Sequence, residues 1–173
     1  MNNSREQAAR RAATDPLVAE LAELLLARSA CITTAESCTG GLIAGALTDR
    51  AGSSAWFEQA VVTYSNAAKQ SLLDVPAQVF DTHGAVSEAC VRAMAQGAAQ
   101  RSGALVAVAA SGIAGPDGGT LDKPVGTVWL GWAIGPALSA ELLLLHGDRR
   151  AIREQAVLHA LRGTISRLKD GRN

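Results

Sequence analysis

The stretch Ile32-Thr33-Thr34-Ala35-Glu36-Ser37-Cys38-Thr39-Gly40-Gly41 begins as a short β-like segment and ends as the glycine-rich start of a helix. A strand that enters a helix in this way places small polar groups at a helix N-terminus, where free backbone N–H groups and the helix dipole favour negative charge. Two roles are consistent with this arrangement: binding of a phosphate, or stabilisation of the oxyanion of an attacked carbonyl. In the second role the hydroxyl of Ser37 is the candidate nucleophile.

Hydrophobic periodicity on both sides of this stretch predicts an alternation of helices and strands. Residues 1–14 are polar and alanine-rich and are expected to form a flexible segment, so the single domain is predicted to cover residues 15–173. Asp15 and Pro16 are typical of the first positions of a helix. Further helices are predicted at 40–49, 65–73, 87–103 and 152–168, strands at 30–35, 60–64, 105–109, 125–133 and 140–145, and a loop with at most one helical turn at 76–84.

The order of these elements predicts the fold class. The continuous apolar run at 105–109 is typical of a central strand that is buried on both faces. The gap at 134–137 is short enough for a hairpin, which makes the last two strands antiparallel. We therefore predict an α/β fold, a three-layer α/β/α sandwich with a mixed sheet of roughly five strands.

The composition limits the classes of protein to which the chain can belong. Its 173 residues are enough for one domain with a hydrophobic core and too few for two. Lys and Arg number 16, as do Asp and Glu, so there is no basic excess of the kind that nucleic-acid-binding proteins show. No apolar run approaches the roughly 20 residues of a membrane span. We expect neither a nucleic acid nor a membrane as partner.

The cysteines and the N-terminus indicate the compartment. Cys31, Cys38 and Cys90 form no CxxC pair and no ligand cluster with the histidines. This spacing argues against a disulfide framework and against a zinc site, and it favours a reducing environment. The N-terminal residues also lack the apolar core of a signal peptide, so we expect a cytoplasmic protein. From the spacing of the cysteines and histidines we expect no bound metal.

A nucleophilic Ser37 needs a base, because a free hydroxyl is a weak nucleophile at neutral pH. The three histidines, His83, His146 and His159, stand outside the motifs, which leaves a Ser-His-Asp triad poorly supported. Lys69 follows the second predicted strand, and if that strand lies beside the first, Tyr64, Lys69 and Ser37 can converge above one edge of the sheet. A partly buried lysine with a pKa lowered to about 7–8 can act as a general base.

Each of these assignments has an alternative. Lys69 is also consistent with a solvated lysine on a helix surface. Cys38 is an alternative nucleophile, since a helix N-terminus lowers a thiol pKa, although a small core residue is its more usual role. Arg149, Arg150 and Arg153 follow Gly147-Asp148 at the start of the last helix, where they can bind a phosphate bidentately or form a solvated face.

Five separate motifs resemble one known family. They are TAESCTGG at 34–41, VTYSN at 62–66 with Lys69, GAVS at 84–87, GIAGP at 112–116 and KPVGTV at 123–128. In this order they are similar to the CinA C-terminal domain family, the nicotinamide-nucleotide amidases (NMN deamidases). The resemblance extends from about Leu17 to the last helix, and that family's fold is similar to the sandwich predicted above.

The resemblance implies hydrolysis of the carboxamide of nicotinamide mononucleotide to nicotinate mononucleotide and ammonia, in pyridine-nucleotide salvage. It implies a Ser–Lys mechanism that uses no metal and no cofactor. Ser37 would be the nucleophile, Lys69 the base that activates it, and Tyr64 would assist proton transfer or orient Lys69.

The resemblance also implies how the substrate is bound. Backbone N–H groups near Thr39 and Gly40 would form the oxyanion hole, and Arg149 or Arg153 would bind the ribose phosphate. The complete set of implied substrate-binding residues is Glu36, Thr39, Gly40, Gly41, Ser111, Gly112, Arg149 and Arg153. Relatives commonly pair, so a homodimer or a higher homo-oligomer is expected.

The chain departs from the family pattern at Ser111, where the second loop usually begins with threonine. The hydroxyl is retained, so we expect a hydrogen-bonding role to persist without the methyl group. Two other functions stay open on the sequence: a nucleotide-binding or regulatory domain that has lost the chemistry, and a Ser–Lys amidase for another small amide.

Overall fold

A mixed five-stranded sheet forms the centre of the computed structural model, which describes the backbone of residues 2–171 and the side chains of residues 11–171. The strand order is β2-β1-β3-β4-β5, in which β1, β2 and β3 are parallel and β4 and β5 run antiparallel to their neighbours. The strands are β1 (Ile32–Glu36), β2 (Phe57–Val62), β3 (Val106–Gly112), β4 (Thr127–Ile134) and β5 (Ala137–Leu144).

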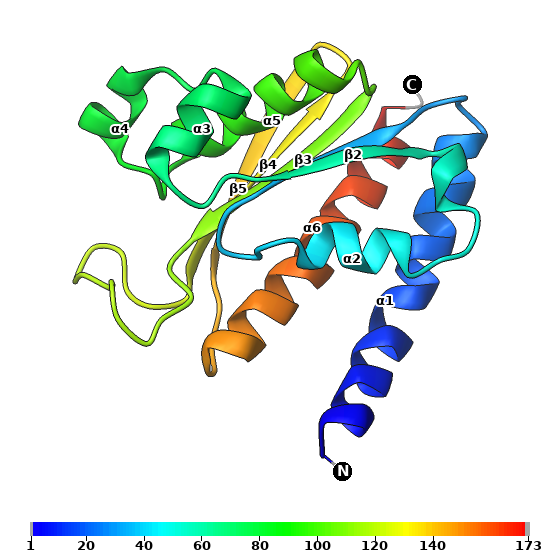
Figure 1. Cartoon of the computed structure of the whole chain (residues 1–173), viewed down its shortest axis with the longest axis horizontal. Helices are drawn as coiled ribbons and strands as arrows, with labels where there is room; N and C mark the ends of the chain where they lie inside the picture. Colours follow the sequence, from blue (N-terminus) through cyan, green and yellow to red (C-terminus); the bar gives the residue numbers. More distant parts are fainter. Residues whose placement is uncertain (1, 172–173) are drawn as a thin grey trace.

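Helices cover both faces of this sheet (Figure 1). The first face carries α1 (Asn2–Leu26), α2 (Leu42–Thr48) and α6 (Arg149–Asp170), which contact one another, and the short 3-10 helix η1 (Ser53–Ala55) leads into β2. The second face carries α3 (Asn66–Leu73), α4 (Ala77–His83) and α5 (Glu88–Ser102). The predicted α/β/α sandwich with a mixed sheet and a final antiparallel hairpin is therefore confirmed.

The small residues of the chain allow close packing on the second face. A Cβ atom on Gly131 of β4 would lie 2.5 Å from the carbonyl oxygen of Val91 in α5. One on Gly97 of α5 would lie 2.0 Å from the carbonyl oxygen of Leu73 in α3. Because real Cβ atoms do not approach a backbone so closely, glycine at these positions lets α5 lie directly on the sheet and α3 directly on α5.

The prediction that the first helix begins at Asp15-Pro16 is wrong, because α1 begins at Asn2 and contains Pro16. A proline removes only one backbone hydrogen bond, and the residues before it are mainly good helix formers. The Arg11 guanidinium also bonds the Asp49 carboxylate at the end of α2, at 3.2 Å, which holds this part of α1 beside the domain. The predicted flexibility of residues 1–14 stays a prediction, and Met1 lies outside the described residues.

Several other boundaries differ from the prediction, including β2, which was expected at 60–64, and β5, which was expected at 140–145. The segment predicted as a loop with at most one helical turn at 76–84 contains the seven-residue helix α4, for which Pro76 is the N-cap. Strand β3 continues to Gly112 because Ser111 and Gly112 pair with Trp129 and Val128 of β4.

Within residues 2–171, none of the helices combines the length and the hydropathy that a membrane crossing requires.

Candidate active site

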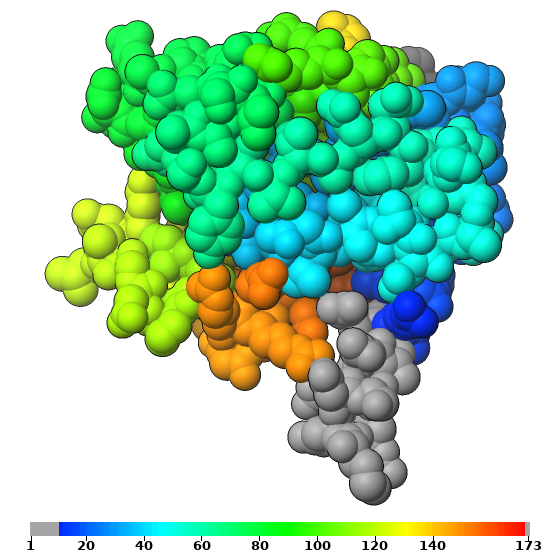
Figure 2. Space-filling view, in the orientation of Figure 1, coloured from blue at the N-terminus to red at the C-terminus, as the bar shows by residue number. Residues whose placement is uncertain are grey.

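The carboxyl ends of the three parallel strands meet at one edge of the sheet, and the segments that follow them form the candidate site. Ser37 directly follows β1, where its N–H donates to the Ala110 carbonyl of β3 at 2.9 Å. Thr63 directly follows β2, and its N–H donates to the Glu36 carbonyl at 2.8 Å. Figure 2 shows the residues after β1 and β2, the loop after β3 and the start of α6 meeting on one face of the molecule.

Lys69 and Ser37 converge at this edge, as predicted. Ser65 caps α3 by accepting a hydrogen bond from the Ala68 N–H at 3.1 Å, which sets the start of the helix that carries Lys69. The Lys69 Nζ atom lies 3.0 Å from the Ser37 Oγ atom and 2.9 Å from the Thr63 carbonyl oxygen. The Tyr64 carbonyl oxygen is 3.5 Å from Nζ.

Lys69 is not a solvated surface lysine, since its exposed fraction is 1%. Burial lowers the pKa of the Lys69 amine, against the raising effect of the nearby Cys90 and Cys38 thiols. The charged ammonium form can donate to all three surrounding oxygens. The neutral form can donate its two protons to the Thr63 and Tyr64 carbonyls, which leaves its lone pair facing the Ser37 hydroxyl. This geometry suits a general base.

The structure favours a core role for Cys38 over the alternative of a nucleophile. Its side chain belongs to the hydrophobic core between the sheet and α6. Burial is the largest influence on the thiol and raises its pKa to about 11, above its ordinary value of 9.0. A thiol that stays protonated at neutral pH and packs in a core acts as a small apolar residue.

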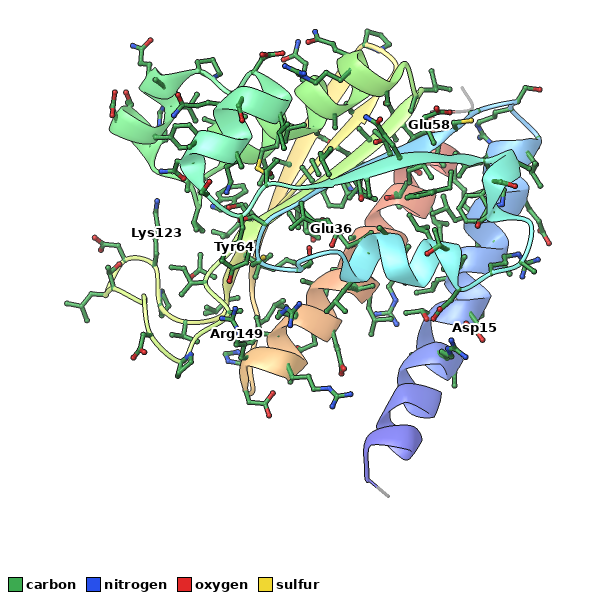
Figure 3. All side chains as sticks on the ribbon, viewed as in Figure 1. Asp15, Glu36, Glu58, Tyr64, Lys123 and Arg149 are labelled. Atoms are coloured by element: carbon green, nitrogen blue, oxygen red, sulfur yellow. The ribbon has the colours of Figure 1, made fainter. Side chains whose placement is uncertain are left out.

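Glu36 does not reach the site, although it was predicted to bind substrate. Its fully buried carboxylate accepts hydrogen bonds from the N–H groups of Gly41, Ile43 and Ala44 at 2.8–3.1 Å and from the Thr34 hydroxyl at 3.2 Å. Figure 3 shows this side chain at the start of α2. Glu36 therefore caps α2 from the preceding strand, and it occupies the Gly41 N–H group that was expected to contact substrate.

The two arginines named as phosphate ligands make different contacts. Arg149 donates to the Tyr64 phenol oxygen at 2.8 Å and to the Gly115 carbonyl at 2.7 Å. Arg153, one helical turn later, donates to the carbonyls of Cys38 at 3.0 Å and Thr39 at 2.8 Å. Arg149 thus lies exposed at the rim of the site, whereas Arg153 is bound to the loop that follows Ser37.

The side chain of Tyr64 points away from Lys69. Its exposed fraction is 61%, and Figure 3 shows it beside Arg149. Only the main-chain carbonyl of Tyr64 approaches the Lys69 amine. The prediction that this residue orients Lys69 therefore applies to its backbone, and the structure does not bring the phenol to the proton-transfer path.

Ser111 and Gly112, which were expected to bind substrate, make structural contacts at the end of β3 and the start of the loop that follows it. The hydrogen-bonding role expected of Ser111 is present, but its hydroxyl donates to the Ala85 carbonyl at 2.8 Å. Gly112 allows close strand packing, since a Cβ atom there would lie 2.7 Å from the Thr127 carbonyl oxygen. Lys123, whose position in the KPVGTV motif was the only signal of a role, donates to the His83 and Val86 carbonyls at 3.1 and 2.9 Å (Figure 3).

Two buried hydroxyls close to the Ser37–Lys69 pair, Thr39 Oγ1 and Thr63 Oγ1, have no hydrogen-bond partner among the described residues. Among the same residues, no group of three or more His, Cys, Asp or Glu side chains is placed to hold a metal ion. The chemistry that this arrangement supports is attack by an activated serine hydroxyl, with backbone N–H groups and an exposed arginine nearby.

Comparisons with known proteins agree on one relationship. Residues 14–168 match the family described as the CinA C-terminal domain. The chain is 54% identical over 149 residues to the nicotinamide-nucleotide amidohydrolase PncC of Pseudomonas putida, covering 86% of this chain and 93% of that protein. It is 56% identical over 147 residues to a putative competence-damage inducible protein of Symbiobacterium thermophilum, covering 80% of this chain but only 34% of that longer protein. The crystal structure of the competence damage-inducible protein A of Klebsiella pneumoniae superposes with a TM-score of 0.87 at 42% identity, covering 90% and 97% of the two chains.

Proposed function

The chain belongs to the CinA C-terminal domain family, and from this premise we propose that it hydrolyses the carboxamide of nicotinamide mononucleotide to nicotinate mononucleotide and ammonia. Relatives that are named nicotinamide-nucleotide amidohydrolase and align over most of their own length support the substrate. The observation that carries the proposal is the buried Lys69 amine, 3.0 Å from the Ser37 hydroxyl.

The first half of the proposed reaction forms an acyl-enzyme. The neutral Lys69 amine takes the proton of the Ser37 hydroxyl while Oγ bonds to the carboxamide carbon and the carbonyl becomes an oxyanion. Backbone N–H groups beside Ser37 stabilise that oxyanion. The carbon–nitrogen bond then breaks, and the Lys69 ammonium returns its proton to the leaving nitrogen, so that ammonia departs and the nicotinoyl group stays esterified to Ser37.

The second half releases the acid. Lys69, neutral again, takes a proton from a water molecule that attacks the ester carbon. When the resulting tetrahedral intermediate collapses, Ser37 Oγ leaves and recovers a proton from Lys69. One water is consumed and one ammonia is formed, so the enzyme returns to its starting state without an external reductant or oxidant.

The phosphate of the substrate is assigned to Arg149. Its guanidinium is exposed at the rim of the site, at the start of α6, where the helix dipole also favours an anion. Its present partners, the Tyr64 phenol and the Gly115 carbonyl, orient the guanidinium and leave its remaining N–H donors for a charged phosphate. The reducing cytoplasm expected from the sequence remains part of this proposal, and it is consistent with three free thiols.

An assay of the purified chain with nicotinamide mononucleotide, read out as ammonia, tests the proposal. We expect turnover by the wild type, none by Ser37→Ala, and unchanged turnover by Ser71→Ala, which removes an exposed hydroxyl on α3. Activity that survives in Ser37→Ala would refute the mechanism. Tight binding of the nucleotide without ammonia release would instead favour a binding or regulatory domain, and turnover of other amides alone would favour a different amidase.

A further inference from the structure

The guanidinium of Arg153 bonds two successive carbonyls of the loop after Ser37. Nε donates to the Cys38 oxygen at 3.0 Å and Nη2 donates to the Thr39 oxygen at 2.8 Å, although more than a hundred residues separate these segments. The donors of a guanidinium lie in one plane at fixed spacing, so one side chain sets the orientation of both peptide groups.

This contact determines where the N–H groups of the loop point. In a trans peptide the C=O and the N–H of the same unit point in opposite directions. Binding of the Cys38 carbonyl by Arg153 therefore turns the Thr39 N–H away from α6. The Ser37 carbonyl accepts from the Gly40 N–H at 3.1 Å, which in the same way directs the Cys38 N–H away from Gly40.

Most of the other N–H groups in this region are already used. Gly40 donates to Ser37, and Leu42 donates to Thr39 at 3.3 Å. Gly41, Ile43 and Ala44 donate to the Glu36 carboxylate. Within the described residues, the N–H groups of Cys38 and Thr39 donate to no oxygen, and so they remain available to a bound oxyanion.

We propose that Arg153 is a positioning residue for the oxyanion formed at Ser37. By holding the Cys38 carbonyl it directs the Thr39 N–H, and by holding the Thr39 carbonyl it keeps the Gly40 N–H on the Ser37 carbonyl, which in turn directs the Cys38 N–H. The N–H groups of Cys38 and Thr39 then stabilise the oxyanion. The inference rests on the proposed amidase function. The N–H of the residue after a nucleophilic serine commonly serves as such a donor where a strand turns into a helix. The Gly40 N–H was expected to belong to the oxyanion hole, but it donates to the Ser37 carbonyl and is therefore left out of this proposal.

The same contact separates the roles of the two arginines. Arg153 is partly buried and uses two of its nitrogens on the loop, whereas Arg149 is exposed. Gly40 is matched to this arrangement, because a Cβ atom there would lie 3.1 Å from Arg153 Nη2 and the residue has a φ of +59°. A larger residue at this position would press on the guanidinium.

Kinetics on two substrates distinguish positioning from phosphate binding. Nicotinamide mononucleotide and the corresponding riboside, which lacks the phosphate, are compared in Arg153→Ala, Arg153→Lys and the control Arg162→Ala, an exposed arginine of the same helix. We expect Arg153→Ala to lower kcat about 100-fold on both substrates, because a small misplacement of catalytic groups costs about that much. Arg153→Lys recovers little, since an ammonium lacks the planar fork. A rise in KM for the nucleotide alone would show that Arg153 binds phosphate and would overturn the inference.

A second measurement does not depend on the proposed substrate. A fluorophosphonate probe labels a reactive serine. Its phosphorus bonds to Ser37 Oγ as fluoride leaves, and the serine proton passes to Lys69. The phosphoryl oxygen of the probe then occupies the oxyanion position. We expect Arg153→Ala to slow labelling, followed by intact mass, by at least tenfold, while thermal melting verifies that the variant is folded. Equal labelling rates in folded wild type and variant would overturn the positioning role. Labelled wild type that releases no ammonia from the nucleotide would refute the proposed function only.

Discussion

Lys69 Nζ and Ser37 Oγ lie 3.0 Å apart, although 32 residues separate them and they follow different strands. The relationship depends on β1 and β2 being neighbours, since Ser37 directly follows β1 and Lys69 lies on α3, the helix that follows β2. The Lys69 amine is buried, and it also donates a hydrogen bond to the Thr63 carbonyl at 2.9 Å. In the proposed mechanism, this amine is the base that activates the Ser37 hydroxyl.

Activity should require the neutral form of Lys69. Lys69→Met removes the base, and Lys69→Arg retains the charge but cannot be deprotonated, so both are expected to lower kcat by about 10²–10⁴-fold. Because burial lowers the pKa of Lys69, kcat/KM of the wild type should fall as the pH drops through that lowered pKa. Ammonia release measured across pH checks this, and an Arg variant with near wild-type activity would contradict it.

Lys69 should also make the free energy of unfolding rise with pH. Between the lowered pKa of folded Lys69 and its ordinary value of 10.5, the unfolded chain binds more protons, so the free energy of unfolding rises with pH. This contribution is lost as the pH falls through the window. Urea denaturation of wild type and Lys69→Met at several pH values tests it; parallel curves for the two proteins would refute the assignment.

Alkaline pH should destabilise the fold through Cys90. Burial raises the pKa of this thiol to about 11, against the lowering effect of Lys69. The folded state therefore keeps the proton above the ordinary value of 9.0, and the stabilisation is present below that pH and lost as the pH rises to about 11. The difference in unfolding free energy between wild type and Cys90→Ala should shrink across this interval. Because both proteins contain Lys69, its own titration does not account for such a change. A difference in unfolding free energy that stays constant across the interval would contradict the prediction.

Glu36→Gln should destabilise the protein strongly. A neutral amide loses the charge-assisted bonds to the N–H groups of α2 and turns its own NH₂ group toward one of these donors. We expect a loss of about 2–4 kcal/mol in the free energy of unfolding, together with lower kcat, since Ser37 is the next residue. Glu58→Gln, which neutralises an exposed carboxylate on β2, is the matched control and should stay within about 0.5 kcal/mol of the wild type. Equal stability of the two variants in urea would show that the capping bonds contribute little.

Tyr64→Phe should affect substrate binding more than chemistry. The phenol contacts Arg149, and only the backbone carbonyl of residue 64 approaches Lys69. Loss of one hydrogen bond to Arg149 is expected to raise KM for nicotinamide mononucleotide about two- to tenfold and to leave kcat nearly unchanged. If steady-state kinetics instead showed a 100-fold lower kcat at constant KM, the phenol would belong to the proton-transfer path.

The sequence alone was sufficient for most of the elements, and it indicated that Ser37 and Lys69 converge if the first two strands are neighbours. Hydrophobic periodicity is local, and so are the caps at Ser65 and Ser87, whose hydroxyls accept bonds from N–H groups three residues later. Strand order was not predictable in this way, and the sequence left the adjacency of β1 and β2 as a condition that the structure meets. Boundaries failed where long-range contacts extend an element, as at Ser111 and Gly112, which pair with β4.

The amino-acid pattern therefore indicated which side chains to consider: a serine at the end of β1, a lysine on the helix after β2 and a cluster of arginines at the start of the last helix. Which group each of these side chains contacts became clear only from the three-dimensional fold. Arg149 and Arg153 are four residues apart and look equivalent in the sequence, yet one bonds Tyr64 and Gly115 and the other bonds Cys38 and Thr39. Glu36 looks like a site residue and is a helix cap. These partners depend on how α6 and α2 are rotated against the sheet, which is set by core packing across the whole chain and not by any local pattern.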